Sequence, residues 1–220
     1  MSGTLLLPPL LTGAQVTVEL TLTSTVLGAM LAFSAGMARG AGPWPLRLFA
    51  ATYIEIFRGT SLLVQLFWLY YALPLIGPRI DPFVTGIIAL SLNIGAYGAE
   101  VVRGALLAVP RAQHEAAVAL NFTARQTLWR IILPQALPEM MPPLGNLAVQ
   151  NLKDTSLVSM ITIADLTFRA QTLRNLTLNS IPVYSLTLLL YFAMALVLMA
   201  GMRGLERWVR IKGQGDMARA

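Results

Sequence analysis

Long apolar runs separated by short charged segments are the feature that most restricts how this chain can fold. A transmembrane helix needs roughly 20 mostly apolar residues, and five runs are about that long: Leu11–Met37, Phe49–Leu73, Phe83–Leu107, Leu144–Ala164 and Pro182–Met202. Only 12% of the 220 residues are charged, about half the share found in soluble domains. The sequence therefore predicts an all-α polytopic membrane protein with about five transmembrane helices.

The rest of the sequence narrows the class of membrane protein further. We find no linker or internal repeat, so residues 1–220 are expected to form one transmembrane domain, with its core at about residues 12–208. The chain has no cysteine and one histidine, His114, so neither a disulfide nor a metal site is predicted. No catalytic set is evident either, and we expect a non-enzymatic chain. No lysine or arginine precedes Arg39, so the first span is expected to remain uncleaved.

Basic residues are distributed unevenly over the segments between the spans. If the N-terminus lies outside, the inside loops and the basic tail (residues 203–220) hold Arg39, Arg47, Arg103, Arg111, Arg125, Arg130, Arg203, Arg207, Arg210, Lys212 and Arg219. The outside loops then hold Arg79, Arg169 and Arg174. Eleven against three is the bias of a membrane protein with its basic loops in the cytoplasm. We therefore expect the N-terminus outside and the C-terminus inside, and no nucleic-acid partner.

The second and third spans contain polar groups that lipid would not tolerate. Glu55 and Arg58 are three residues apart, so they share a helix face and are predicted to form a structural ion pair. Asn93, Tyr97 and Glu100 are three to four apart and line one stripe of the third span. This stripe is predicted to face either a polar path or, for Glu100, a helix-end contact. The glycines of the same span should allow neighbouring helices to approach closely.

The fourth span is the most polar of the five. It contains Gln150, Asn151, Lys153, Asp154, Thr155 and Ser156. These side chains must face the interior of the bundle or a watery path, because they are costly in lipid. For Lys153 and Asp154 two interpretations stay open: a buried ion pair that orders the helices, or the lining of that path.

A basic segment at about residues 110–135 joins the third and fourth spans. Glu115, Arg125 and Arg130 would each be costly in hydrocarbon, so we expect this segment in the cytoplasm.

The pattern of this segment predicts two short helices. The first is Glu115–Leu120, after which Asn121 can adopt a left-handed turn. Thr123 is the expected N-cap of the second helix, and Pro134 is expected to end it.

This segment resembles the cytoplasmic signature of permease subunits of ATP-binding-cassette (ABC) importers. The resemblance is carried by Glu115-Ala116-Ala117, the turn residue Asn121 where the family has glycine, and Ile131, Leu133 and Pro134. Other stretches resemble the polar amino-acid group: Phe57-Arg58-Gly59-Thr60-Ser61-Leu62-Leu63-Val64-Gln65, with Ser61 where proline is usual, and Lys153-Asp154-Thr155-Ser156-Leu157. The resemblance as a whole extends over about Thr12 to Trp208.

The resemblance implies an import subunit of a bacterial cytoplasmic membrane. Glu115, Ala116, Ala117, Asn121, Leu133 and Pro134 would then form a coupling helix that docks on a cytoplasmic ATPase dimer. An external solute-binding protein would deliver the substrate, and a second permease chain, identical or sister, would complete the path. The chain has no phosphate-binding G-x-x-x-x-G-K-[ST] loop, so ATP and Mg²⁺ would bind to the partner, and no cofactor to this chain. The substrate path would use the polar residues of spans three and four.

Two other classes of protein remain as alternatives. An ATP-independent secondary transporter or small channel would need no docking segment, and it would usually carry inverted repeats, which we do not find. A membrane-embedded enzyme subunit would need a convergent catalytic set.

Overall fold

The computed structural model describes residues 3–217, and its elements are helices throughout this range. In chain order they are α1 (Gly3–Ala41), α2 (Trp44–Gly59), α3 (Leu62–Phe67), the π-helical η1 (Trp68–Ala72), α4 (Leu73–Ile76), α5 (Pro82–Ala108), α6 (Arg111–Ala119), α7 (Ala124–Thr127), the π-helical η2 (Leu128–Ile132), α8 (Leu133–Asp154), the 3-10 helix η3 (Thr155–Ile161), α9 (Leu166–Thr177) and α10 (Ser180–Met217). The all-α prediction is confirmed for these residues.

Three of these helices are long and apolar enough to cross a membrane alone: Leu6–Ala41, Pro82–Ala108 and Ser180–Val209. A fourth candidate is the pair Trp44–Gly59 and Leu62–Ile76, which is bent by 102° at a short break. The described residues therefore contain three spans by this criterion, or four if the bent pair counts as one. Helix α8, which holds most of the polar fourth span, does not meet this criterion of length and apolar composition.

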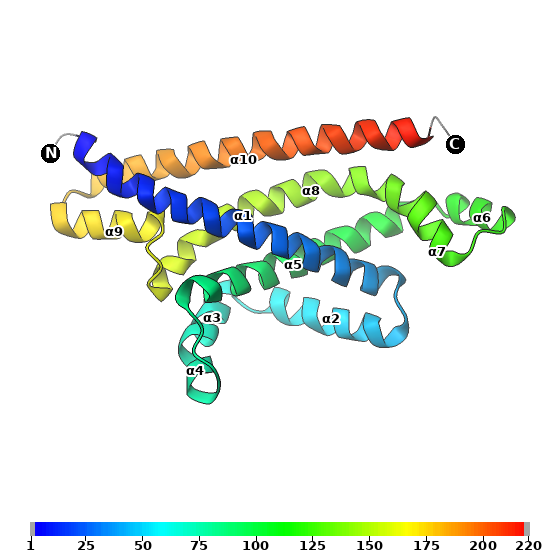
Figure 1. Cartoon of the computed structure of the whole chain (residues 1–220), viewed down its shortest axis with the longest axis horizontal. Helices are drawn as coiled ribbons and strands as arrows, with labels where there is room; N and C mark the ends of the chain where they lie inside the picture. Colours follow the sequence, from blue (N-terminus) through cyan, green and yellow to red (C-terminus); the bar gives the residue numbers. More distant parts are fainter. Residues whose placement is uncertain (1–2, 218–220) are drawn as a thin grey trace.

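The long helices lie along the long axis of the molecule (Figure 1). Helices α1 and α10 begin at the same end, and α10 finishes at the opposite end, where α6 and α7 also lie. Helices α3 and α4 turn away from this axis and project from the side of the bundle. The basic segment between α5 and α8 and the basic end of α10 therefore share one end of the molecule.

Helices α1 and α5 approach each other closely because glycines face the contact. A Cβ atom added at Gly98 would come within 2.7 Å of the Ala32 Cβ, and one at Gly95 within 2.8 Å of the Leu31 Cβ. A Cβ at Gly104 of the same helix would meet nothing within 4 Å. The predicted role of glycine in close helix approach thus holds for Gly95 and Gly98 but not for Gly104.

Substitution of Gly98 by alanine is expected to destabilise the fold, although alanine favours helices. The added methyl would overlap Ala32 and force α1 from α5, and such overpacking costs roughly 1–3 kcal/mol. Gly104→Ala is the matched control, because it adds the same methyl in open space and should stabilise the helix by up to about 1 kcal/mol. Thermal unfolding in detergent measures both. Equal shifts for the two variants would contradict the close contact.

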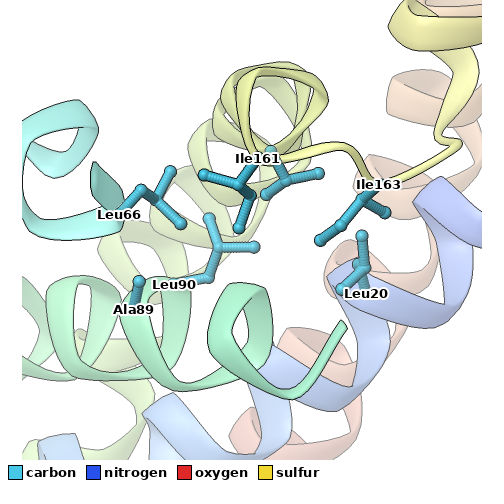
Figure 2. Close-up of a cluster of buried hydrophobic side chains, with 7 residues drawn as sticks. Leu20, Leu66, Ala89, Leu90, Ile161 and Ile163 are labelled. Carbon is cyan, nitrogen blue, oxygen red and sulfur yellow. The ribbon is translucent and has the colours of Figure 1, made fainter. Parts of the chain in front are cut away.

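A cluster of buried hydrophobic side chains joins α1, α3, α5 and the segment around η3 (Figure 2). Leu20 of α1, Leu66 of α3 and Leu90 of α5 point toward Ile161 and Ile163, and none of these five is more than 5% exposed. The cluster therefore fixes α3 and the end of η3 on the body of the bundle, next to the breaks described below.

The second and fourth predicted spans are not single α-helices. The run Phe49–Leu73 breaks at Thr60 and Ser61, both of which have extended backbone. The run Leu144–Ala164 stays α-helical only as far as Asp154, continues as η3, and ends at Thr162 with a φ of 68°. Both predictions assumed that an apolar run is one uninterrupted helix.

Two prolines lie inside helices directly after π-helical turns. The Leu73 N–H donates to the Trp68 carbonyl ahead of Pro74, and the Leu133 N–H donates to the Leu128 carbonyl ahead of Pro134. In a regular α-helix a proline ring clashes with the carbonyl four residues earlier, and the wider π turn relieves that crowding. The prediction that Pro134 ends its helix is therefore wrong, because the helix continues into α8.

Candidate functional site

A cleft of about 390 Å³ lies where α2, α3, α5 and α8 meet, and we call it the central cleft. Its lining residues are Thr60, Ser61, Leu62, Asn93, Ile94, Tyr97, Leu147, Gln150, Asn151 and Asp154. Five residues predicted for a polar path lie in this lining: Asn93, Tyr97, Gln150, Asn151 and Asp154. The structure thus brings together residues from spans three and four that are more than 50 positions apart in the sequence.

The break between α2 and α3 forms one wall of the central cleft. The Gln65 Nε2 donates to the carbonyl oxygens of Phe57 (3.0 Å) and Thr60 (3.3 Å) and to the Thr60 Oγ1 (2.8 Å). The Asn93 Nδ2 also donates to the Phe57 carbonyl (3.3 Å). These side chains replace backbone partners that the interrupted helix lacks, as helix ends inside a bundle require. Within the membrane, irregular backbone is tolerated where it lines a cavity.

The end of α8 forms the opposite wall. The Gln150 Nε2 donates to the Asp154 carboxylate (2.8 Å) one turn later, so these two side chains share one face toward the cleft. Lys153 is exposed and does not line the cleft. Asp154 therefore has its hydrogen bond with Gln150 instead of the ion pair with Lys153 that one interpretation predicted.

Asn151 holds α8 on α1. Its Nδ2 donates to the Ser24 Oγ (2.7 Å) and the Thr25 Oγ1 (3.0 Å), and its side chain is buried. Ser24 and Thr25 of α1 thus pack on α8. The amide of Asn151 is used in this contact, so Asn151 positions the wall of the central cleft.

Thr155 and Ser156 lie beyond the central cleft. Thr155 is fully buried and donates to the Leu152 carbonyl (2.7 Å). The carbonyl of Ser156 accepts a hydrogen bond from the Ser159 hydroxyl (2.8 Å). Both residues stabilise the change from α8 to η3, and their predicted place in a polar path is not supported by the cleft lining.

Glu100 lies outside the cleft, at the centre of a charged cluster. Its carboxylate contacts Arg39 of α1 (2.7 Å), Arg58 of α2 (4.0 Å) and Arg103 of α5 (2.8 Å). The ion partner of Glu55 is Arg39 (3.6 Å). The predicted Glu55–Arg58 pair is therefore wrong, because Arg58 turns toward Glu100.

The cluster around Glu100 reaches the cleft through Arg58 and Tyr97. The Arg58 guanidinium lies over the Tyr97 ring, 5.2 Å from its centroid, and Tyr97 lines the cleft. A cation over an aromatic face is attracted by the ring quadrupole. Arg58 therefore adds positive charge beside one lining residue, Tyr97, whereas Asp154 is itself part of the lining.

The segment between α5 and α8 forms a second candidate site. Glu115 and Ala116 are exposed on α6, and Ala117 is buried beneath them. Asn121 has a φ of 56°, which confirms the predicted left-handed turn. The predicted cap at Thr123 is also confirmed, because Thr123 and Gln126 form a reciprocal capping box. Leu133 and Pro134 are half-buried at the start of α8.

Sequence reasoning missed Thr60, Ser61 and Leu62 as cleft residues. They lie within an apolar run that was assigned to a continuous span. The available signal was Gly59-Thr60-Ser61, three residues with weak helix preference in the middle of a hydrophobic segment.

Comparison with known proteins decides the family. Residues 24–211 match the family described as "Binding-protein-dependent transport system inner membrane component", and this range is well over half of the chain. The chain belongs to that family. It is thus an integral membrane permease subunit, and the family description itself implies a binding protein as a functional partner.

The permease also has similar relatives among individual proteins. It is 54% identical over 212 residues, 92% of this chain and 89% of the relative, to "Probable amino-acid ABC transporter permease protein y4tF" of Sinorhizobium fredii. It is 36% identical to "Glutamine transport system permease protein GlnP" of Escherichia coli, covering 93% of this chain and 94% of the relative. These relatives place the permease among the amino-acid ABC permeases.

Solved structures show the same fold. The structure described as "Crystal structure of an amino acid ABC transporter with histidines" has a TM-score of 0.84 at 34% identity, covering 91% of this chain and 94% of that chain. The inward-facing MetNI methionine ABC transporter has a TM-score of 0.77 at 19% identity, over 91% of this chain and 95% of that one, and this likeness concerns the fold alone.

Proposed function

We propose that this permease forms the membrane path of an ATP-driven importer for polar amino acids or related zwitterionic or cationic solutes. It works as a dimer with an identical or sister permease chain in a bacterial cytoplasmic membrane. The broken pair α2–α3 and the polar helix α8 each count as one span, so that the permease has five spans. Its N-terminus lies outside the cytoplasm. The placement of α6, α7 and the end of α10 at one end of the molecule supports this orientation.

The observation that carries the proposal is the central cleft at two helix interruptions. The α2–α3 break and the α8–η3 change both border it. Its lining offers the Asp154 carboxylate, the Gln150 amide and the Ser61 and Tyr97 hydroxyls. A carboxylate and amide oxygens suit an ammonium group, and the nearby Arg58 suits a carboxylate. An amino acid presents both groups, whereas an aliphatic cargo would need neither.

The stretch from α6 to α7 (residues 111–127), which we call the α6–α7 segment, couples the permease to the ATPase that hydrolyses ATP. In the proposed mechanism, nucleotide binding closes a cytoplasmic ATPase dimer, and the segment around Glu115 moves with it. This motion shifts the bundle between inward-open and outward-open states, for which the ATPase must bind the two states with different affinity. Exposed Glu115 and Ala116 over buried Ala117 allow close docking of a partner surface on α6.

The proposal is tested by ATPase activity in proteoliposomes. The permease is co-expressed with its ATPase, and binding proteins loaded with single amino acids are added. Glu115→Ala removes one interface anchor, which costs about 1–2 kcal/mol, so stimulated hydrolysis should fall about tenfold.

The matched control is Glu19→Ala, because Glu19 is also exposed but lies on α1, outside the α6–α7 segment. It should leave hydrolysis unchanged. If the permease moved amino acids without an ATPase, a secondary transporter or channel would replace the importer.

A further inference from the structure

A second cleft of about 390 Å³ lies between α8 and α10, and we call it the α8–α10 cleft. Its apolar wall is formed by Met141, Gly145, Met199 and Met202, and its polar end by Asn146, Arg203 and Glu206. A Cβ at Gly145 would be 3.4 Å from the Met202 Cβ, so the missing side chain helps to keep the cleft open. No residue of the central cleft takes part in it.

Among the three single-helix candidate spans in the described residues, α10 is the most exposed to its surroundings. Only 17% of its most apolar window is buried, compared with 50% for α5. It also lies at the edge of the bundle, opposite the projecting α3 and α4 (Figure 1). In a membrane the exposed apolar face of such a helix contacts lipid tails. The flexible methionine side chains of the α8–α10 cleft can adapt to an irregular apolar ligand.

Positive charge begins where the apolar part of α10 ends. Arg203 and Arg207 are exposed and one helical turn apart, and Arg210 and Lys212 follow in the sequence. The Arg203 Nε donates to the Met199 carbonyl (3.3 Å), and a guanidinium has five N–H donors, so donors remain for a phosphate. Glu206 is the one acidic residue between Arg203 and Lys212. This stretch therefore carries a net charge of +3, the difference between four basic residues and one acidic residue.

We infer that the α8–α10 cleft binds an anionic phospholipid of the cytoplasmic leaflet. The headgroup phosphate contacts Arg203 and Arg207, and an acyl chain lies along the methionine-lined wall. Clusters of basic residues directly cytoplasmic of a transmembrane helix attract anionic lipid. Exposed Trp208 in the same turn is a typical anchor at the membrane interface. The inference rests on the proposed orientation of the chain.

The test compares two lipids with identical acyl chains, phosphatidylglycerol and phosphatidylcholine. The permease complex is purified in detergent, each lipid is added, and thermal unfolding and retained lipid by native mass spectrometry are measured. We expect phosphatidylglycerol to raise the Tm by roughly 5 °C more than phosphatidylcholine. Arg203→Gln should remove this difference. Arg79→Gln, which changes another exposed arginine in the loop before α5, should preserve it.

A second variant separates the acyl chain from the headgroup. Gly145→Leu fills the cleft and should lower the number of retained lipids while leaving the arginines in place. Equal stabilisation by both lipids, an unchanged preference in Arg203→Gln, or equal stabilisation by inorganic phosphate alone would each overturn the inference. These measurements use no substrate, binding protein or ATP, so failure of the proposed transport function would not be mistaken for failure of lipid binding.

Discussion

Substitution of Glu100 by glutamine is expected to destabilise this permease strongly. Glu100 is the common partner of Arg39, Arg58 and Arg103, and its side chain is only 19% exposed. Glutamine keeps the size but removes the charge, so three guanidinium groups repel one another in a partly buried site. Removal of one partner of a buried ion pair costs about 3–5 kcal/mol, and the partial exposure favours the lower limit.

Thermal unfolding in detergent measures this effect, and a loss of about 3 kcal/mol corresponds to a Tm lowered by roughly 10 °C. Glu55→Gln is the matched control, because its side chain is 74% exposed and its partner Arg39 lies at 3.6 Å. Exposed ion pairs contribute about 0–1 kcal/mol, so this variant should unfold close to the wild-type temperature. Similar Tm values for the two variants would show that Glu100 does not hold α1, α2 and α5 together.

The contrast between these glutamates also shows what the sequence could not predict. The spacing of Glu55 and Arg58 suggested an ion pair, because residues three apart share a helix face. Arg58 instead reaches Glu100 of α5, and Glu100 is also bound by Arg39, 61 residues earlier in the chain. Local spacing shows which side chains can meet within one helix. It does not show that a residue from another helix offers a better-enclosed partner.

Sequence patterns were more reliable where a feature depends on residues that are close together in the chain. The left-handed turn at Asn121 and the capping box at Thr123 depend on residues within one or two turns, and both were predictable. The length of the apolar runs also predicted the long helices α1, α5 and α10. The break at Thr60 was not predictable from an apolar run, because it is stabilised by Gln65 and by Asn93 from another helix. One wall of the central cleft depends on that break.

Substitution of Asp154 by asparagine is expected to impair transport more than any other change in the central cleft. Asp154 supplies the carboxylate of the cleft, and an ammonium group of a bound amino acid would form a charge-assisted hydrogen bond with it. Hydrogen bonds to charged groups contribute about 1.5–3 kcal/mol, so uptake at low substrate concentration should fall roughly 10- to 100-fold. Asparagine keeps the side-chain size and can still pair with Gln150, so the fold should be retained.

Uptake of labelled amino acids into proteoliposomes measures this loss, with the amino acid chosen by the ATPase experiment. Lys153→Gln is the matched control, since it removes a charge at the neighbouring position while its side chain is exposed and outside the cleft. It should transport at the wild-type rate. Basal ATPase activity should be normal in both variants, because neither residue lies in the α6–α7 segment. Equal loss in both variants would mean that net charge near the end of α8 matters, rather than a carboxylate that contacts the substrate.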